Sequence, residues 1–190
     1  MPTNQNIADM VGKGITVDAF VSQMKPEYQE KLNEWQEGFT WVDHSQEVLS
    51  FMRTRSDLHC SIIASDWCGD VHRNFPVIIE VMNQATVPVE VFVQENHPSF
   101  IDVFRTLGGK SVPKVIISNT SGDVHFTWGP RPAFIQEPMA YFKSLQLKDS
   151  DSEYAAERTK AYEGIQARYG EDFDYQKLVV YELTNLLSQT

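Results

Sequence analysis

Residues 65–73 read Ser65-Asp66-Trp67-Cys68-Gly69-Asp70-Val71-His72-Arg73. An apolar run, Leu58 to Ala64, precedes this stretch, and a run with helical spacing, Phe75 to Met82, follows it. We therefore predict that Cys68 lies where a strand turns into a helix. The first amides of a helix have no partner within the helix and carry the positive end of its dipole, which stabilises a thiolate. We expect Cys68 to be a reactive thiol whose pKa lies below the free value of about 8.5.

Composition limits the classes of protein to which the chain can belong. Its 190 residues, 42% of them hydrophobic, are enough for one full-sized core and too few for two ordinary domains. The net charge of −10 argues against nucleic-acid binding, which requires clustered Lys and Arg. No stretch approaches the roughly 18 apolar residues of a membrane span, and the first fifteen residues lack the apolar centre of a secretory signal. We therefore expect a soluble, cytoplasmic protein without a membrane partner.

The middle of the chain alternates between strand and helix patterns. The expected elements are a buried strand at 58–64, a helix at 68–84, a second strand at 87–94, a short helix at 98–107, a hairpin at 114–118 and 124–128, and a helix at 134–145. Strands joined through helices run parallel, and the hairpin adds antiparallel strands. The fold class is therefore α/β, with a central mixed sheet flanked by helices.

Helices also extend the chain at both ends. We divide it into an N-terminal helical extension at 1–55, a central domain at 56–147 and a C-terminal helical hairpin at 148–190. Residues 1–14 are polar and are expected to be frayed. The hairpin is expected to pair a helix at 154–169 with one starting at Asp174, and to pack onto the core or onto a second subunit. A homo-oligomer formed through the helical extensions is therefore possible.

Asp66-Trp67-Cys68-Gly69, placed after the first core strand, resembles the active site of the thioredoxin superfamily, which commonly reads Trp-Cys-Gly-Pro-Cys. Pro76 stands where thioredoxins have a kinking proline in the active-site helix. Gly108-Gly109-Lys110-Ser111-Val112-Pro113 is similar to the loop that carries their cis-proline, and Gly129 matches the glycine that borders their substrate groove. The resemblance covers residues 56–147 and implies a thioredoxin-like fold. In detail the chain resembles bacterial thioredoxin-like proteins whose site reads Trp-Cys-Gly-Asp.

The resemblance also implies a set of site residues. Val112-Pro113 would place the Val112 backbone beside Cys68, free to pair with an extended partner chain. Trp67 and Trp128 would flank the groove, although either could equally belong to the core. The candidate catalytic residue is Cys68, and the candidate substrate-binding residues are Trp67, Gly69, Asp70, Val112, Pro113, Trp128 and Gly129.

The chain departs from the thioredoxin pattern at three positions. Val71 replaces the second cysteine, Ile62 stands where many thioredoxins keep a buried Asp, and Asp70 replaces the usual Pro. Cys60 cannot substitute for the missing cysteine, because the extended residues from Cys60 to Ser65 would span roughly 17–20 Å, far more than a disulfide allows. Thioredoxin-type dithiol turnover is therefore not available.

Two functions remain open. Cys68 could act as a monothiol oxidoreductase on a protein or low-molecular-weight disulfide, with an external thiol resolving the adduct. Alternatively, Cys68 is a relic and the chain is a non-catalytic binding module that uses the groove beside Pro113. A glutaredoxin-like iron–sulfur role is a distant third, since one cysteine leaves most of the ligation to outside groups.

The histidines do not indicate a metal or cofactor. His72, four residues after Cys68, could stabilise the thiolate when protonated, but we favour an exposed polar residue on the first turn. The other four histidines, His44, His59, His97 and His125, have no ligand spacing. We therefore expect no metal and no cofactor.

Overall fold

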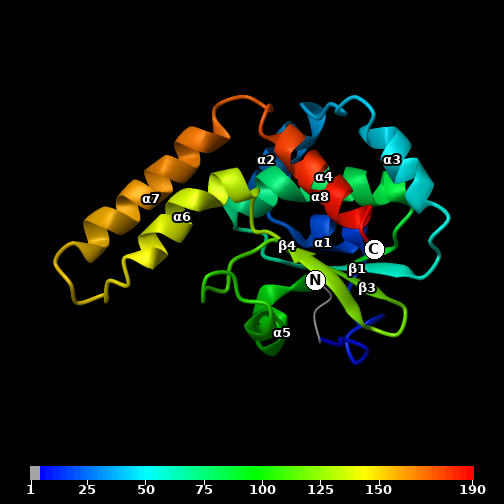
Figure 1. Cartoon of the computed structure of the whole chain (residues 1–190), viewed down its shortest axis with the longest axis horizontal. Coiled ribbons are helices and arrows are strands. Elements are labelled where there is room, and N and C mark those ends of the chain that lie inside the picture. The colour runs from blue at the N-terminus through cyan, green and yellow to red at the C-terminus, as the bar shows by residue number, and fades with distance from the viewer. Residues whose placement is uncertain (1–4) are drawn as a thin grey trace.

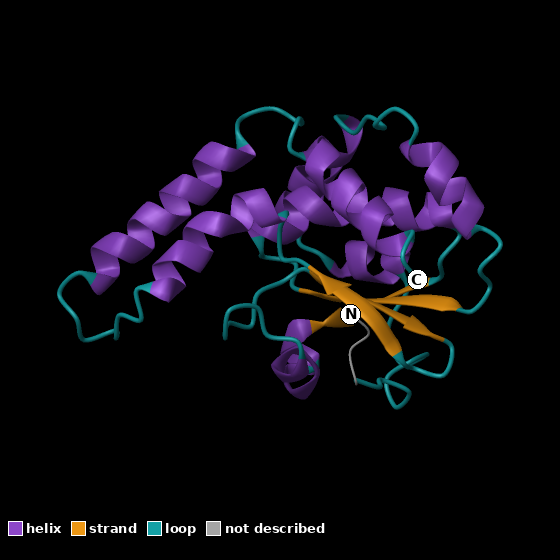
Figure 2. Cartoon of the chain, viewed as in Figure 1, coloured by secondary structure: helices purple, strands orange, loops and turns teal. Residues whose placement is uncertain are grey.

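A four-stranded mixed sheet forms the centre of the molecule (Figures 1 and 2). The computed structural model describes residues 5–190. The strands are ordered β2-β1-β3-β4; β1 is parallel to β2, and the β1–β3 and β3–β4 pairs are antiparallel. Their bounds are β1 Leu58–Ala64, β2 Val89–Val93, β3 Lys114–Asn119 and β4 Val124–Trp128. The central strand β1 is almost wholly buried, which explains its unbroken apolar sequence. The predicted mixed sheet with helices around it is confirmed.

One face of the sheet is covered by a layer of helices built on α4, which directly follows β1. Helices α2, α3 and α8 pack against α4, and α1 contacts β2, whereas α5 lies on the other side of the sheet (Figure 1). Their bounds are α1 Val17–Gln23, α2 Pro26–Glu37, α3 Ser45–Met52, α4 Gly69–Ala85, α5 Pro98–Val103 and α8 Gln176–Leu187, with a short 3-10 helix, η1, at Gln94–Asn96. The helical layer fixes α4, and therefore the residue at its start, against the sheet.

The C-terminal helices differ from the expected pairing. Helix α7 (Tyr154–Tyr169) lies along α6 (Ala133–Ser144), and the two project from the body as an arm (Figure 1). Helix α8 returns to pack on α4 and α3. The apolar stripe of α8, which includes Val179 and Leu183, is fully buried there. The hairpin is therefore formed by α6 and α7, because α8 has a larger apolar face to cover.

The segment before α1 is held in place rather than frayed. The Ile7 amide donates to the Gly122 carbonyl at 2.8 Å, and Ile15 forms an antiparallel bridge with Val91 on β2. The buried carboxylate of Glu90 accepts from the amides of Gly12 and Gly14. The fraying expected for residues 1–14 is therefore wrong for residues 5–14, and residues 1–4 lie outside the described part. No helix within residues 5–190 is long and apolar enough to cross a lipid bilayer.

Candidate active site

Cys68 occupies the position just before the first turn of α4, and three residues separate it from the end of the buried strand β1. Its backbone is extended, with φ −80° and ψ 123°, and the helix begins at Gly69. The thiol is partly exposed, and its Sγ donates to the Val112 carbonyl oxygen at 3.3 Å. The Val112–Pro113 peptide bond is cis. The structure thus places the Cys68 thiol beside the Val112–Pro113 backbone.

The environment of the thiol overturns the expected pKa. Burial raises the pKa of Cys68 above its ordinary value, and the negative charge of Asp70 raises it further. The backbone amides of Val71 and Asp70 at the helix start act in the opposite direction but do not outweigh these two effects. The prediction of a lowered pKa was therefore wrong, because sequence gives the helix start but not the extent of desolvation.

Asp70 belongs to a buried polar cluster that the sequence did not reveal. Its carboxylate is paired with the Arg131 guanidinium through two hydrogen bonds, one of them 3.1 Å from Nε to Oδ1. The Tyr169 hydroxyl donates to the same Oδ1 at 2.7 Å. Asn74 of α4 donates to the Tyr169 oxygen at 2.8 Å and to the Pro130 carbonyl at 2.9 Å. The cluster therefore ties α4 to both the turn after β4 and the end of α7.

His72 is not the exposed polar residue that we expected. Its side chain is buried, its ring stacks on Tyr28 at a centroid distance of 5.3 Å, and Nε2 lies 2.5 Å from the Asp66 carbonyl oxygen. Because a carbonyl oxygen only accepts, Nε2 carries the proton. Burial lowers the pKa of His72. We assign His72 a structural role in fixing the loop before Cys68.

The two candidate groove tryptophans lie in different surroundings. Trp67 is 58% exposed, and its Nε1 donates to Glu95 at 2.7 Å. Trp128 is only 5% exposed, and its Nε1 donates to Glu182 of α8 at 2.7 Å. Trp128 is therefore buried, is hydrogen-bonded to α8 and offers almost no surface to a partner.

Gly129 joins the turn after β4 to the cis-proline loop. Its φ of +104° is open to glycine, and a Cβ there would lie 2.2 Å from the Pro113 carbonyl oxygen. The buried ammonium of Lys114 donates to the Gly129 carbonyl at 3.0 Å and also to Thr106. Burial lowers the pKa of Lys114 to about 8. These contacts fix the turn after β4 against the backbone of Pro113 and the side chain of Lys114.

Val112 lies beside the thiol and is buried, with only 3% of its surface exposed. Its carbonyl accepts from the Cys68 thiol, and within residues 5–190 its amide has no hydrogen-bond partner. Strand β3 begins only at Lys114, so Val112 lies outside the sheet ladder.

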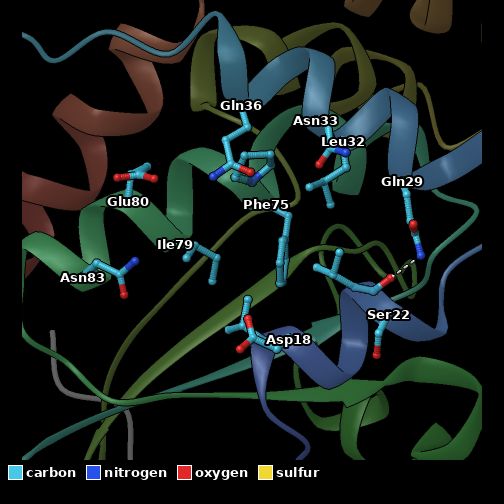
Figure 3. A pocket seen from close by; sticks show the side chains of 13 residues that line it. Asp18, Ser22, Gln29, Leu32, Asn33, Gln36, Phe75, Ile79, Glu80 and Asn83 are labelled. Atoms are coloured by element: carbon cyan, nitrogen blue, oxygen red, sulfur yellow. Dashed lines mark hydrogen bonds between the residues drawn. The ribbon is translucent and has the colours of Figure 1, made fainter. Parts of the chain in front are cut away.

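One cavity lies away from the thiol, between α1, α2 and α4 (Figure 3). It has a volume of about 440 Å³, an apolar wall that includes Phe75 and Ile79, and a polar rim that includes Asp18 and Glu80. None of the predicted site residues lines it. Among residues 5–190, no three His, Cys, Asp or Glu side chains lie close enough together to hold a metal ion.

Comparison with known families identifies the chain. Residues 14–163 match the family described as thioredoxin. The chain belongs to the thioredoxin family. A search of curated proteins finds no match for this thioredoxin-family chain.

Two solved structures share the fold. A protein of unknown function from Pseudomonas aeruginosa is 13% identical, with a TM-score of 0.65 over 97% of this chain and 98% of its own. An HIV epitope scaffold is 12% identical, with a TM-score of 0.64 over 98% of this chain and 99% of its own. At such low identity the similarity shows the fold alone.

This thioredoxin-family chain has no second cysteine near Cys68. Val71, at the position of the second cysteine, is fully buried. Cys60, the other cysteine in the chain, is fully buried in β1, where burial and the Glu90 charge raise its pKa. Arg131 and Tyr169 are the site residues that sequence reasoning missed. Arg131 stands between two prolines in a turn, which was a usable signal, whereas nothing in the sequence around Tyr169 indicated its contact with Asp70.

Proposed function

We propose that the protein is a monothiol oxidoreductase that exchanges disulfides through Cys68 and depends on an external thiol for resolution. The observation that carries this proposal is the contact of Cys68 Sγ with the Val112 carbonyl, beside a backbone amide that a substrate chain can pair with. A disulfide held on this loop would present one sulfur to Cys68. The substrate is a protein or a low-molecular-weight disulfide.

The exchange proceeds in two balanced steps. The Cys68 thiol loses its proton to solvent, and the thiolate attacks one sulfur of the disulfide. The old S–S bond breaks, its electron pair leaves with the departing thiolate, and that thiolate takes up a proton. An external thiolate then attacks the substrate sulfur of the mixed disulfide, forms a new disulfide with it and releases Cys68 as thiolate. Because burial and Asp70 raise the pKa of Cys68, we expect the first step to be slow at neutral pH.

Mass spectrometry of the native protein after incubation with a small disulfide tests the proposal. We expect one adduct, located at Cys68, that a small thiol removes. The Cys68→Ser variant should form no adduct, and the matched Cys60→Ser variant should form the same adduct as the wild type. An adduct at Cys60, or none in the folded protein, would overturn the proposal.

A second candidate function is a non-catalytic binding module that uses the groove beside Pro113. The raised pKa of Cys68 and the exposed indole of Trp67 favour this alternative. Partner capture that survives Cys68→Ser but is lost in Trp67→Ala would support binding without chemistry. Capture that requires the thiol would favour exchange.

A further inference from the structure

A second cavity adjoins the thiol site on the side of the arm. It lies between α6, α7 and the loop at 106–111, with a volume of about 230 Å³, and we call it the arm cavity. Ser111 lines it and directly precedes Val112, whose carbonyl accepts from Cys68. Arg131 also lines it and is paired with Asp70. The arm cavity therefore shares both the cis-proline loop and the Asp70 cluster with the thiol site.

The charge of the arm cavity is opposite to that of the whole protein. Lys143 and Arg158 line it, and no Asp or Glu does, although the chain carries a net charge of −10. Among residues 5–190, neither Lys143 nor Arg158 forms an ion pair. The Asp149 carboxylate raises the pKa of the Tyr154 hydroxyl, and Asp149 does not line the cavity. Two cations without carboxylate partners thus face a hollow beside the reactive sulfur.

The remaining lining is suited to a small polar ligand. Hydroxyl groups of Thr106, Ser111, Tyr154 and Tyr162 line the cavity. Phe142 packs edge-on against Tyr154 at 5.3 Å, and Arg158 lies over the Tyr162 ring at 5.6 Å. The volume is below the roughly 300–1,000 Å³ of pockets that enclose a drug-sized ligand. The cavity therefore fits one end of a small molecule rather than a nucleotide.

We propose that the arm cavity binds the carboxylate end of an anionic low-molecular-weight thiol, the co-substrate that exchanges with Cys68. Lys143 and Arg158 bind the carboxylates by charge-assisted hydrogen bonds, and Arg can do so in bidentate geometry. The hydroxyl groups of Ser111 and Tyr162 at the wall donate to the remaining oxygens. This inference rests on the proposed function, since it names the class of thiol that serves it.

Rates of adduct formation with four disulfides test the proposal. The probes are glutathione disulfide, which carries carboxylates, the neutral hydroxyethyl disulfide, the cationic cystamine and the phosphate-bearing coenzyme A disulfide. The wild type should prefer glutathione disulfide over the neutral probe by roughly tenfold after correction for intrinsic reactivity, as expected for about 1.4 kcal/mol of binding. The double variant Lys143→Gln/Arg158→Gln should lose this preference. The matched double variant Lys13→Gln/Lys177→Gln, with the same net charge, should keep it.

A binding measurement separates this inference from the proposed function. Calorimetric titration of Cys68→Ser with S-methylglutathione, which cannot exchange, should show binding that the Lys143→Gln/Arg158→Gln substitutions abolish. If all probes form adducts without any charge preference, the proposed role of the arm cavity is wrong and the exchange function stands. If S-methylglutathione binds in the calorimeter but the wild type forms no adduct with any probe, the exchange function is wrong and the binding role of the arm cavity stands. A preference for coenzyme A disulfide would overturn the assignment to carboxylates.

Discussion

The Tyr169 hydroxyl donates a 2.7 Å hydrogen bond to Asp70 Oδ1, although the two residues are 99 positions apart. The last residue of α7 therefore contacts the first turn of α4, next to Cys68. Tyr169 is buried, and burial together with the Asp70 charge raises its pKa, so the hydroxyl stays protonated and remains a donor. The C-terminal extension is thus part of the environment of the thiol.

Asp70 and Arg131 are expected to shift the pKa of Cys68 in opposite directions. Asp70→Asn removes a negative charge that raises this pKa, so the pKa falls and alkylation at pH 7.5 speeds up by roughly tenfold per unit of pKa. Arg131→Gln removes a positive charge that lowers it, so the pKa rises and alkylation slows. The rate of Cys68 alkylation by iodoacetamide, measured as a function of pH, checks both predictions. The Asp102→Asn variant, at an exposed aspartate, is the control. Acceleration in both variants would mean that loosening of the fold, not charge, controls the thiol.

Tyr169→Phe is expected to destabilise the fold without changing its charge. The variant removes a hydrogen bond to a carboxylate and also the Tyr169 acceptor of Asn74, which then donates only to the Pro130 carbonyl; this should cost about 2 kcal/mol in the free energy of unfolding. Urea unfolding measures the loss. Tyr141→Phe, at an exposed tyrosine, should change stability by less than about 0.5 kcal/mol. Equal effects in the two variants would contradict the importance of the buried cluster.

Lys114 should make stability rise with pH. Burial lowers its pKa to about 8 in the folded state, from 10.5 for an ordinary lysine, so between these values the unfolded chain binds more protons. Raising the pH through this window therefore favours the folded state. Between pH 8 and 10.5, the free energy of unfolding of the wild type should rise by up to about 3 kcal/mol relative to that of Lys114→Met.

Urea unfolding at several pH values checks the Lys114 effect. The exposed Lys148→Met variant should show no such trend relative to the wild type. A stability difference between the wild type and Lys114→Met that stays constant from pH 7 to 10.5 would refute the lowered pKa.

Glu182 is expected to anchor α8 to the end of the sheet. Its two carboxylate oxygens accept from Trp128 Nε1 at 2.7 Å and from the Ala133 amide at 2.8 Å. Glu182→Gln places an NH2 group against one of these donors and should lower stability by about 1–2 kcal/mol. Thermal unfolding measures the change, and the exposed Glu163→Gln variant serves as its control. If both variants have the same melting temperature as the wild type, α8 is held by its apolar face alone.

The order of elements could be predicted from the sequence because each strand and helix has its own local pattern. The apolar run of β1 and the helical spacing after Cys68 placed the thiol at a strand–helix junction, where the structure has it. The cluster around Asp70 could not be predicted this way, since Arg131 is 61 positions away and no periodicity marks the pair.

Burial was the other property that the sequence could not supply. The alternating pattern of β4 does not indicate that Trp128 is buried and bonded to α8, and a helix start does not indicate how much protein surrounds Cys68. The raised pKa of Cys68 results from that surrounding protein. Tertiary packing therefore decided the chemistry of a residue whose position local patterns had located.

The N-terminal segment has a consequence for how copies of this molecule behave in concentrated solution. Ile15 bridges to β2, and the Gln5 carbonyl accepts from the amide of Val124, the first residue of β4, so both outer strands are occupied at these points by their own chain. Outer strands with free amides and carbonyls can recruit further strands and grow into fibres. The two contacts of the N-terminal segment therefore protect the outer strands against such polymerisation.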